Sequence, residues 1–295
     1  SSDLFDNIAA TSPAELLRGK VSGVQITSSS GEPGAANSIR IRGNGTLRGG
    51  NGPLIVVDGV PLAGGDVSAG GANMNLGTMT AKDPLSFINQ NDIESMSILK
   101  DASSTAIYGA RGANGVIIIT TKKGKSNKND FQFSSYLGLS KAVSNVDVLN
   151  LTDYKTLINE INPSYLTTAN DPKYAGINTN WQDKILRTGI DQNYNFSYAG
   201  GTDKVKFYGA LGYQVTEGII NPSKYNRFSG KINMNANLYS WLKTDVSLNV
   251  IQSDGSYISD NNSVGQGGAV MSALVTPSFL PIWGSQLNVR ETNTD

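Results

Sequence analysis

The second half of the chain alternates strictly between apolar and polar residues. Five stretches show this pattern, at residues 131–139, 192–199, 204–216, 227–238 and 242–250. Alternation of this kind gives a strand one apolar face and one wet face. Most of the stretches exceed the ~5–6 residues of an average strand and suit the ~9–11 residues of a tilted membrane-spanning strand. We therefore predict long antiparallel strands of a membrane β-barrel.

The wet faces of these strands carry mainly Asn, Ser, Lys and Gln. A soluble β-sandwich with one wet face per sheet is the alternative architecture. Such wet faces, however, are typical of a water-filled lumen. We expect the inward-facing charged residues mainly to hydrate that lumen and to hydrogen-bond whatever fills it.

The links between the strands alternate in length. Residues 200–203 and 239–241 are tight turns, whereas residues 141–190 form a long link. Within the long link, Tyr154, Leu157, Ile158 and Ile161 have the spacing of one helix face. Outer-membrane barrels have short periplasmic turns and long external loops. We therefore predict that residues 141–190 lie outside the cell and the tight turns at the periplasmic rim, where Tyr198, Tyr239 and Trp241 would form part of an aromatic girdle.

The first half of the chain mixes helix and strand signals. Ser12 and Pro13 open a short capped helix. Strand patterns follow at residues 21–26, 38–42, 54–57 and 115–121, and a short helix is expected at residues 101–107. Asp58-Gly59 is a turn signal. These elements predict a small α+β domain.

The composition excludes several functions. The 295 residues contain 24 basic and 24 acidic side chains, and neither Cys nor His. A neutral chain gives no electrostatic reason to expect nucleic-acid binding. No thiol or imidazole chemistry and no His/Cys metal site can be built, so we expect no catalytic residues, no metal site and no cofactor. No apolar run approaches the ~20 residues of a transmembrane helix, and no targeting segment is visible.

Four segments resemble one family. They read SIRIRG at residues 38–43, PLIVVDGVP at 53–61, NDIESMSILK at 91–100 and DASSTAIYGARGANGVIIITTKK at 101–123. Together they resemble the plug domain of TonB-dependent outer-membrane transporters, and the wording of the last two is similar to the SusC-like branch. The resemblance implies a plug domain over residues 1–124, a linker over 125–130 and the N-terminal part of a transmembrane barrel over 131–295. It also implies that the protein is not an enzyme.

The same resemblance implies a function. A SusC-like protein in the bacterial outer membrane imports an oligosaccharide, a peptide or another large nutrient, together with a SusD-like surface lipoprotein and driven by TonB. A siderophore or cobalamin receptor is the nearest alternative, because it uses the same plug. A surface adhesin would explain the strands but not the plug motifs.

The chain departs from the family in the number of strands. The family closes a barrel of about 22 strands, whereas this chain offers five. Five strands would leave both edges unpaired in lipid. We therefore expect an internal fragment of a longer transporter, without its signal peptide, N-terminal extension and TonB-contacting segment.

Candidate site residues lie in the plug half. Arg40 and Arg42 fall on the polar face of a predicted strand, and we expect them to contact the barrel wall. Amides and short acids pair well with hydroxyl-rich ligands, because they donate and accept in pairs. We therefore expect substrate contacts on two polar loops, from Asn44, Arg48, Asn51, Asp66, Asn73 and Asn75.

Overall fold

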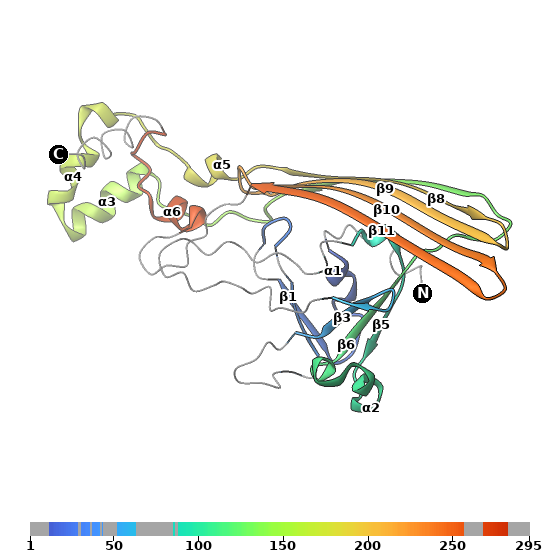
Figure 1. Cartoon of the computed structure of the whole chain (residues 1–295). Coiled ribbons are helices and arrows are strands. Elements are labelled where there is room, and N and C mark those ends of the chain that lie inside the picture. The colour runs from blue at the N-terminus through green and yellow to red at the C-terminus, as the bar shows by residue number, and fades with distance from the viewer. Residues whose placement is uncertain are drawn as a thin grey trace, which may run out of the picture. The chain divides into compact units, whose positions relative to one another are not determined.

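The computed structural model describes residues 12–28, 31–35, 37–41, 43, 52–62, 85, 88–256 and 268–282. Contacts divide the chain into two compact units (Figure 1). The first consists of Ser1–Ser140, Gly189–Gly218 and Pro222–Tyr257. The second consists of Lys141–Thr188, Ile219–Asn221 and Ile258–Asp295. Each unit is described by itself below.

The N-terminal part of the first unit, termed the α+β part, has a small sheet at its centre. The strands are ordered β4-β3-β6-β5, with β3 (Leu54–Val57) parallel to β6 (Val116–Thr121). Strands β4 (Val60–Pro61) and β5 (Ile93–Leu99) pair antiparallel at the two edges. Because β6 is a central strand, its almost continuous apolar run is buried, as expected for a strand covered on both faces.

The remaining elements of this part pack around that sheet or beside it. Strands β1 (Val24–Ser28) and β2 (Asn37–Ile41) form a separate hairpin. Helix α1 (Pro13–Leu17) begins at Ser12, whose hydroxyl accepts from the amide of Ala14 at 3.1 Å. Three short helices complete the part: η2 (Gln90–Asp92), α2 (Ala102–Thr105) and η3 (Ala106–Gly112). The common core contains Leu17, Ile39, Leu85, Ile93, Ile117 and Ile119. The predicted α+β fold is confirmed.

The short helix expected at residues 101–107 is divided in the structure between α2 and η3. Asp101 occupies the N-cap position of α2, but its side chain makes no capping hydrogen bond. Instead, its carbonyl oxygen accepts from the Ser104 hydroxyl at 2.8 Å. The positive φ of Gly109 then interrupts the helical path within η3.

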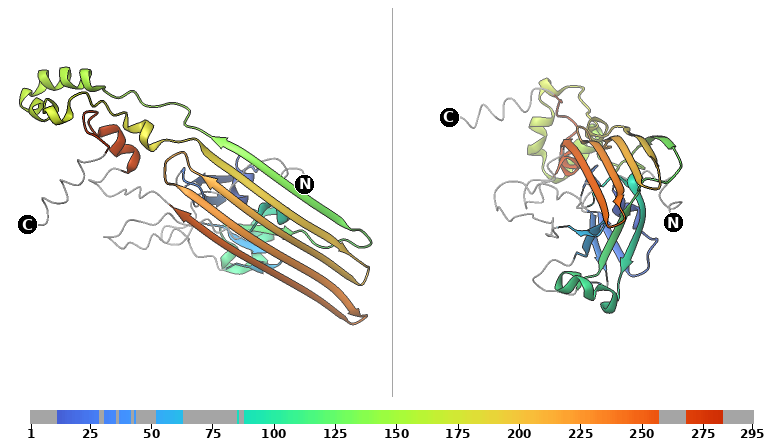
Figure 2. Two further views of the ribbon diagram at one scale, coloured as in Figure 1. Left: turned by 90° about the horizontal axis from the view of Figure 1, so that it is seen from above. Right: turned by 45° about the vertical axis from the view of Figure 1, so that its right-hand side comes forward.

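The second part of the first unit, termed the wall, is a five-stranded antiparallel meander (Figure 2). Its strands are β7 (Asp130–Ser140), β8 (Gly189–Gly201), β9 (Val205–Glu217), β10 (Lys224–Tyr239) and β11 (Leu242–Ser256). Their order in the sheet is β11-β10-β9-β8-β7. All five predicted strands are thus confirmed, and most are longer than the alternating stretches.

The two faces of the wall differ in chemistry. In register, Phe133 faces Phe196, and Phe196 faces Leu211. These side chains belong to an exposed apolar face, which also includes Phe131, Leu137, Tyr213, Phe228, Ile232, Leu248 and Val250. The opposite face is polar, and part of it is buried.

The tight links lie at one end of the sheet, as a meander requires. One joins β8 to β9, and the other joins β10 to β11. A register shift between Asn237 and Tyr239 pairs Tyr239 with Leu242. A bulge re-aims the following side chains, and the Tyr239 and Trp241 rings stack with centroids 5.7 Å apart. The alternation of link lengths is confirmed; the assignment of this rim to the periplasm stays a prediction.

The second unit is helical. It contains α3 (Leu151–Ile161), η4 (Pro163–Tyr165), α4 (Leu166–Ala169), η5 (Pro172–Tyr174), α5 (Trp181–Ile185) and α6 (Ala269–Val275). Helix α3 is the one predicted from its apolar spacing, and Asn150 caps it by accepting from the amide of Asp153 at 3.0 Å. Among the described residues, no helix has the length and apolar character needed to cross a membrane.

Candidate functional site: the contact between the α+β part and the wall

The polar face of the wall is buried where it meets the α+β part. Strand β10 contributes Arg227, Ser229, Lys231 and Asn233, none of which is more than 6% exposed. A buried polar group is costly unless it is hydrogen-bonded. The partners of these side chains therefore define the contact, which consists of three clusters.

The first cluster is centred on Asn89, which is buried at the start of η2. Its amide nitrogen donates to Asn195 Oδ1 at 2.7 Å and to Ser229 Oγ at 3.0 Å. Its amide oxygen accepts from the backbone N–H of Asn91 at 3.1 Å, which caps η2. One side chain thus orders its own turn and binds two strands of the wall.

The glycine facing Asn89 leaves room for this cluster. A Cβ added at Gly212 would press on the Asn89 amide nitrogen and lie 2.6 Å from Ser229 Oγ. Real Cβ atoms do not approach other heavy atoms so closely. A side chain at position 212 would therefore displace Asn89 from its partners.

The second cluster joins Asp92 to Tyr208 of β9. The Tyr208 hydroxyl donates to Asp92 Oδ1 at 2.8 Å, and both residues are buried. Burial raises the pKa of the Asp92 carboxyl, against the opposing effects of the Tyr208 hydrogen bond and of nearby positive charges, first among them Lys231. The Asp92 carbonyl also accepts from the amide of Lys122 at 2.8 Å, which connects this cluster to the end of β6.

The third cluster holds the end of β6. Asp58 accepts from the amide of Thr121 at 2.8 Å and from its hydroxyl at 2.6 Å. Asp58 and Gly59 both have positive φ, as a two-residue turn between antiparallel strands requires. The turn thereby aims the Asp58 carboxylate at Thr121.

Strand β10 closes this third cluster from the wall. Lys231 Nζ lies 3.8 Å from Asp58 Oδ2. Asn233 Nδ2 donates to the carbonyl of Lys122 at 2.9 Å and to Thr121 Oγ1 at 3.3 Å, while its oxygen accepts from Ser247 Oγ at 2.7 Å. Side chains of the wall therefore bind directly to side chains and backbone carbonyls of the α+β part.

Two further glycines allow the main chains to approach closely. A Cβ at Gly124 would collide with the backbone nitrogen of Phe207 in β9. A Cβ at Gly34 would lie 2.8 Å from the ring of Tyr225 in β10. Because backbone atoms cannot rotate away, Gly124 is the stricter requirement.

The residues proposed from the sequence occupy different places. Arg40 is exposed on β2, opposite Gln25 in the hairpin, and Arg42 lies outside the described residues. The proposed contacts of Arg40 and Arg42 with the wall stay predictions. The six candidate substrate residues, Asn44, Arg48, Asn51, Asp66, Asn73 and Asn75, also lie outside the described residues.

Sequence reasoning missed Asn89 and Asp92 and treated Asp58 as a turn residue. In the sequence, the run 89–92 looks like an ordinary polar turn. A usable signal was the glycine at position 212 on the polar face of its strand, because a strand position without a side chain often marks a close approach.

The contact between the α+β part and the wall is mainly polar. Of the six cross-contacts described above, three are neutral hydrogen bonds between short side chains, and water can replace such bonds at a net cost of only ~0.5–1.5 kcal/mol each. Among the described residues, no three acidic side chains gather as metal ligands. Within the part of the chain that the structure describes, no buried apolar cluster joins the α+β part to the wall.

Comparison with known proteins gives the family context. Residues 1–116 match the model of the TonB-dependent receptor plug domain. The chain is 34% identical to the TonB-dependent receptor SusC of Bacteroides thetaiotaomicron over 94% of its own length, which is 26% of that receptor. It also superimposes on a chain of the RagAB peptide importer with a TM-score of 0.73 and 26% identity, covering 95% of this chain and 33% of that one.

A more distant neighbour has the same fold. The siderophore receptor PirA from Acinetobacter baumannii matches with a TM-score of 0.55 and 16% identity, over 94% of this chain and 34% of that chain. The chain thus spans between a quarter and a third of the proteins it resembles. These proteins are receptors and importers and not enzymes.

Proposed function

Because this chain contains a TonB-dependent receptor plug domain followed by SusC-like barrel strands, we propose that the protein imports a large nutrient across the bacterial outer membrane. The observation that carries the proposal is the contact between plug and wall. A plug seated mainly by polar contacts on the lumenal face of lipid-facing strands can be displaced and reseated without exposing an apolar core. An energy source is needed to displace it, and we assign that role to TonB.

The partner and the location follow from the same relatives. We propose a SusD-like surface lipoprotein as the partner, since SusC and the RagAB importer are among the similar proteins. The exposed apolar face of the wall suits the outer-membrane hydrocarbon, with Tyr239 and Trp241 at its rim. An oligosaccharide and a peptide are the substrate classes considered.

We propose further that the polar loops of the plug contact the substrate. The residues concerned are Asn44, Arg48, Asn51, Asp66, Asn73 and Asn75, together with Arg40 and Arg42 as contacts to the wall. Replacing Asn73 and Asn75 with Ala together should reduce uptake without changing the amount of receptor in the membrane. Unchanged uptake kinetics would remove this loop from the site.

Uptake by cells tests the proposed function. The gene for the full-length receptor is deleted and restored, and cells are supplied with fluorescent oligosaccharides, fluorescent peptides or a ferric siderophore. We expect uptake of an oligosaccharide or a peptide that requires the receptor, TonB and a SusD-like lipoprotein. Receptor-dependent uptake of the siderophore alone would favour the alternative, which the fold of PirA supports. No receptor-dependent uptake in any arm would refute import.

A further inference from the structure

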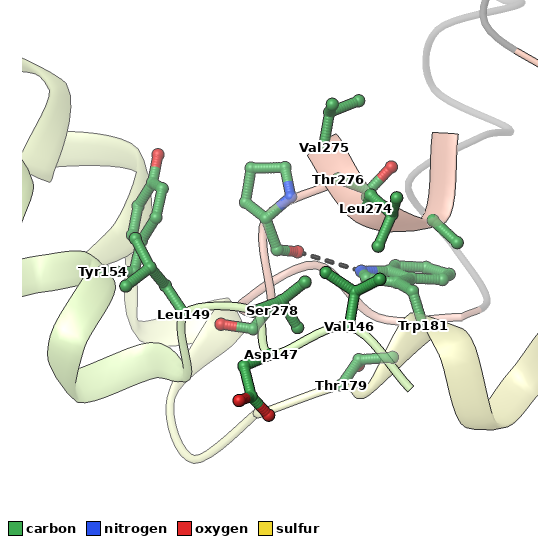
Figure 3. Close-up of a pocket in the computed structure, with 13 residues that line it drawn as sticks. Val146, Asp147, Leu149, Tyr154, Thr179, Trp181, Leu274, Val275, Thr276 and Ser278 are labelled. Carbon is green, nitrogen blue, oxygen red and sulfur yellow. Dashed lines mark hydrogen bonds between the residues drawn. The ribbon is translucent and has the colours of Figure 1, made fainter. Parts of the chain in front are cut away.

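The helical unit contains a cavity that the proposed function does not use (Figure 3). Its volume is about 420 Å³, within the usual range for small-ligand sites. Three segments of the unit line it: the approach to α3, the start of α5, and α6 with the residues after it. The lining is mainly apolar and includes Val146, Leu149, Tyr154, Trp181, Leu274 and Val275.

The cavity is built from fixed segments. Gln182 is buried and binds Val146 twice, accepting from its amide at 2.9 Å and donating to its carbonyl at 2.7 Å. The Thr179 amide donates to the carbonyl of Ser278 at 2.7 Å, which ties the start of α5 to the segment after α6. These bonds hold the walls in place without a ligand, so the cavity is pre-formed.

The hydrogen-bond donors of the lining are largely occupied. Trp181 Nε1 donates to the carbonyl of Pro277 at 3.1 Å, the bond drawn in Figure 3. The Thr179 hydroxyl donates to Leu280 and the Thr276 hydroxyl donates to Ser272, each through a backbone carbonyl. A sugar needs donors and acceptors in pairs. These three donors are not free for a ligand, and the mainly apolar lining suits an apolar group better than a hydroxyl-rich one.

Acceptors, in contrast, remain. Asp147 is the one charged residue of the lining, is exposed, and lies at the edge of the cavity in Figure 3. An apolar lining with one carboxylate at its edge suits a ligand that has an apolar body and a cation.

We propose that this cavity binds a peptide segment that carries an apolar side chain next to a lysine, an arginine or a free amino terminus. The apolar side chain enters between Trp181 and Leu274, and the cation pairs with Asp147. The inference rests on the proposed function, because it selects peptides over oligosaccharides as the substrate class.

Binding to the purified full-length receptor in detergent tests this assignment. The probes are acetyl-Leu-Lys-Leu-Lys-amide, acetyl-Leu-Glu-Leu-Glu-amide and maltotetraose, measured by calorimetry at low salt. We expect the basic peptide to bind most tightly. Asp147→Asn should weaken its binding by about 3- to 5-fold, since an exposed ion pair is weak, and Asp147→Lys should reverse the preference between the two peptides. Glu160→Lys, an exposed charge change on α3 outside the lining, should change neither.

A second pair of variants tests the cavity itself. Val275 is exposed at the lip, so Val275→Trp should cover the opening without disturbing the fold and reduce binding of the basic peptide at least tenfold. Ile161→Trp, an equally exposed position on α3, is the control. Tightest binding of maltotetraose, or equal binding by all variants, would overturn the assignment.

Other outcomes separate this inference from the proposed function. If Val275→Trp abolishes co-purification of a lipoprotein but leaves peptide binding intact, the cavity is a protein contact and the inference is wrong. Receptor-dependent uptake together with insensitivity to Asp147 would leave import standing and refute the cavity. If the receptor imports nothing but its binding of the basic peptide depends on Asp147, the cavity assignment stands and the proposed import is refuted.

Discussion

Substitution of Gly212 with Ala tests how the plug is seated on the wall. Gly212 has no side chain, and its φ lies outside the left-handed region, so alanine adds one methyl group without backbone strain. That methyl would occupy space now used by Asn89, Ser229 and Asn195. Asn89 must then move, and it loses its two hydrogen bonds to the wall.

The size of the effect follows from those two bonds. Leaving buried polar groups unsatisfied costs about 1–3 kcal/mol, and ~1.4 kcal/mol corresponds to a factor of ten. We therefore expect protection of the plug amides around residues 88–99 to fall by about 5- to 140-fold. The thermal unfolding of the barrel should not change.

The assay is hydrogen–deuterium exchange of the full-length receptor in detergent. Gly230→Ala is a matched control, because Gly230 belongs to the apolar face and a Cβ there meets only Leu211 Cδ2 at an ordinary 3.7 Å. If Gly212→Ala and Gly230→Ala show the same plug protection, the Asn89 cluster does not seat the plug.

Three further predictions concern the same contact. Asn233→Ala removes the partner of the Lys122 carbonyl and should lower the free energy that protects the plug amides from exchange by about 1–3 kcal/mol. Asn237→Ala, at an exposed position of the same strand, should leave this protection unchanged. Equal exchange in both variants would refute this prediction. Gly124→Ala drives a methyl group into the backbone of β9 and should leave the plug sensitive to protease. Gly52→Ala is the control, because a Cβ at position 52 meets no atom within 4 Å, and the plug should stay resistant. A resistant plug in both variants would contradict the close approach at Gly124. Because its pKa is raised above the ordinary ~3.9, Asp92 disfavours the seated plug once the pH rises through that raised value, so the contact weakens as pH increases. Asp92→Asn keeps an acceptor for Tyr208 and should flatten this dependence as the pH rises above that ordinary value. Asp92→Ala should weaken the plug throughout. An unaltered slope in Asp92→Asn would assign the dependence to another group.

Much of the fold was predictable because its signals are local. Period-two alternation identified all five strands of the wall, and β-branched runs at residues 54–57 and 115–121 identified the centre of the plug sheet. The wall strands extend beyond the alternating stretches, because backbone pairing with a neighbour continues where the side-chain pattern fails. At the end of β11, for example, Asp254 and Gly255 still pair with β10.

The contact between plug and wall was less predictable for a physical reason. Alternation shows which side chains face inward but not which of them the plug covers. Lys231 and Lys243 have the same pattern in the sequence, yet only Lys231 is buried beside Asp58. Many of the contacts come from short side chains such as Asn89 and Asn233, whose partners depend on the fold as a whole.

Disulfide cross-linking tests the central claim most directly, because this chain has no native cysteine. Cysteines at positions 89 and 212 of the full-length receptor should cross-link under mild oxidation in isolated outer membranes, since a Cβ at position 212 lies against the Asn89 side chain. The matched pair at positions 89 and 230 places the second cysteine on the opposite face of the wall and should not react. Cross-linking of the first pair alone is the result we predict. Failure of the first pair, or equal reaction of both pairs, would show that the plug does not sit on the polar face of these strands.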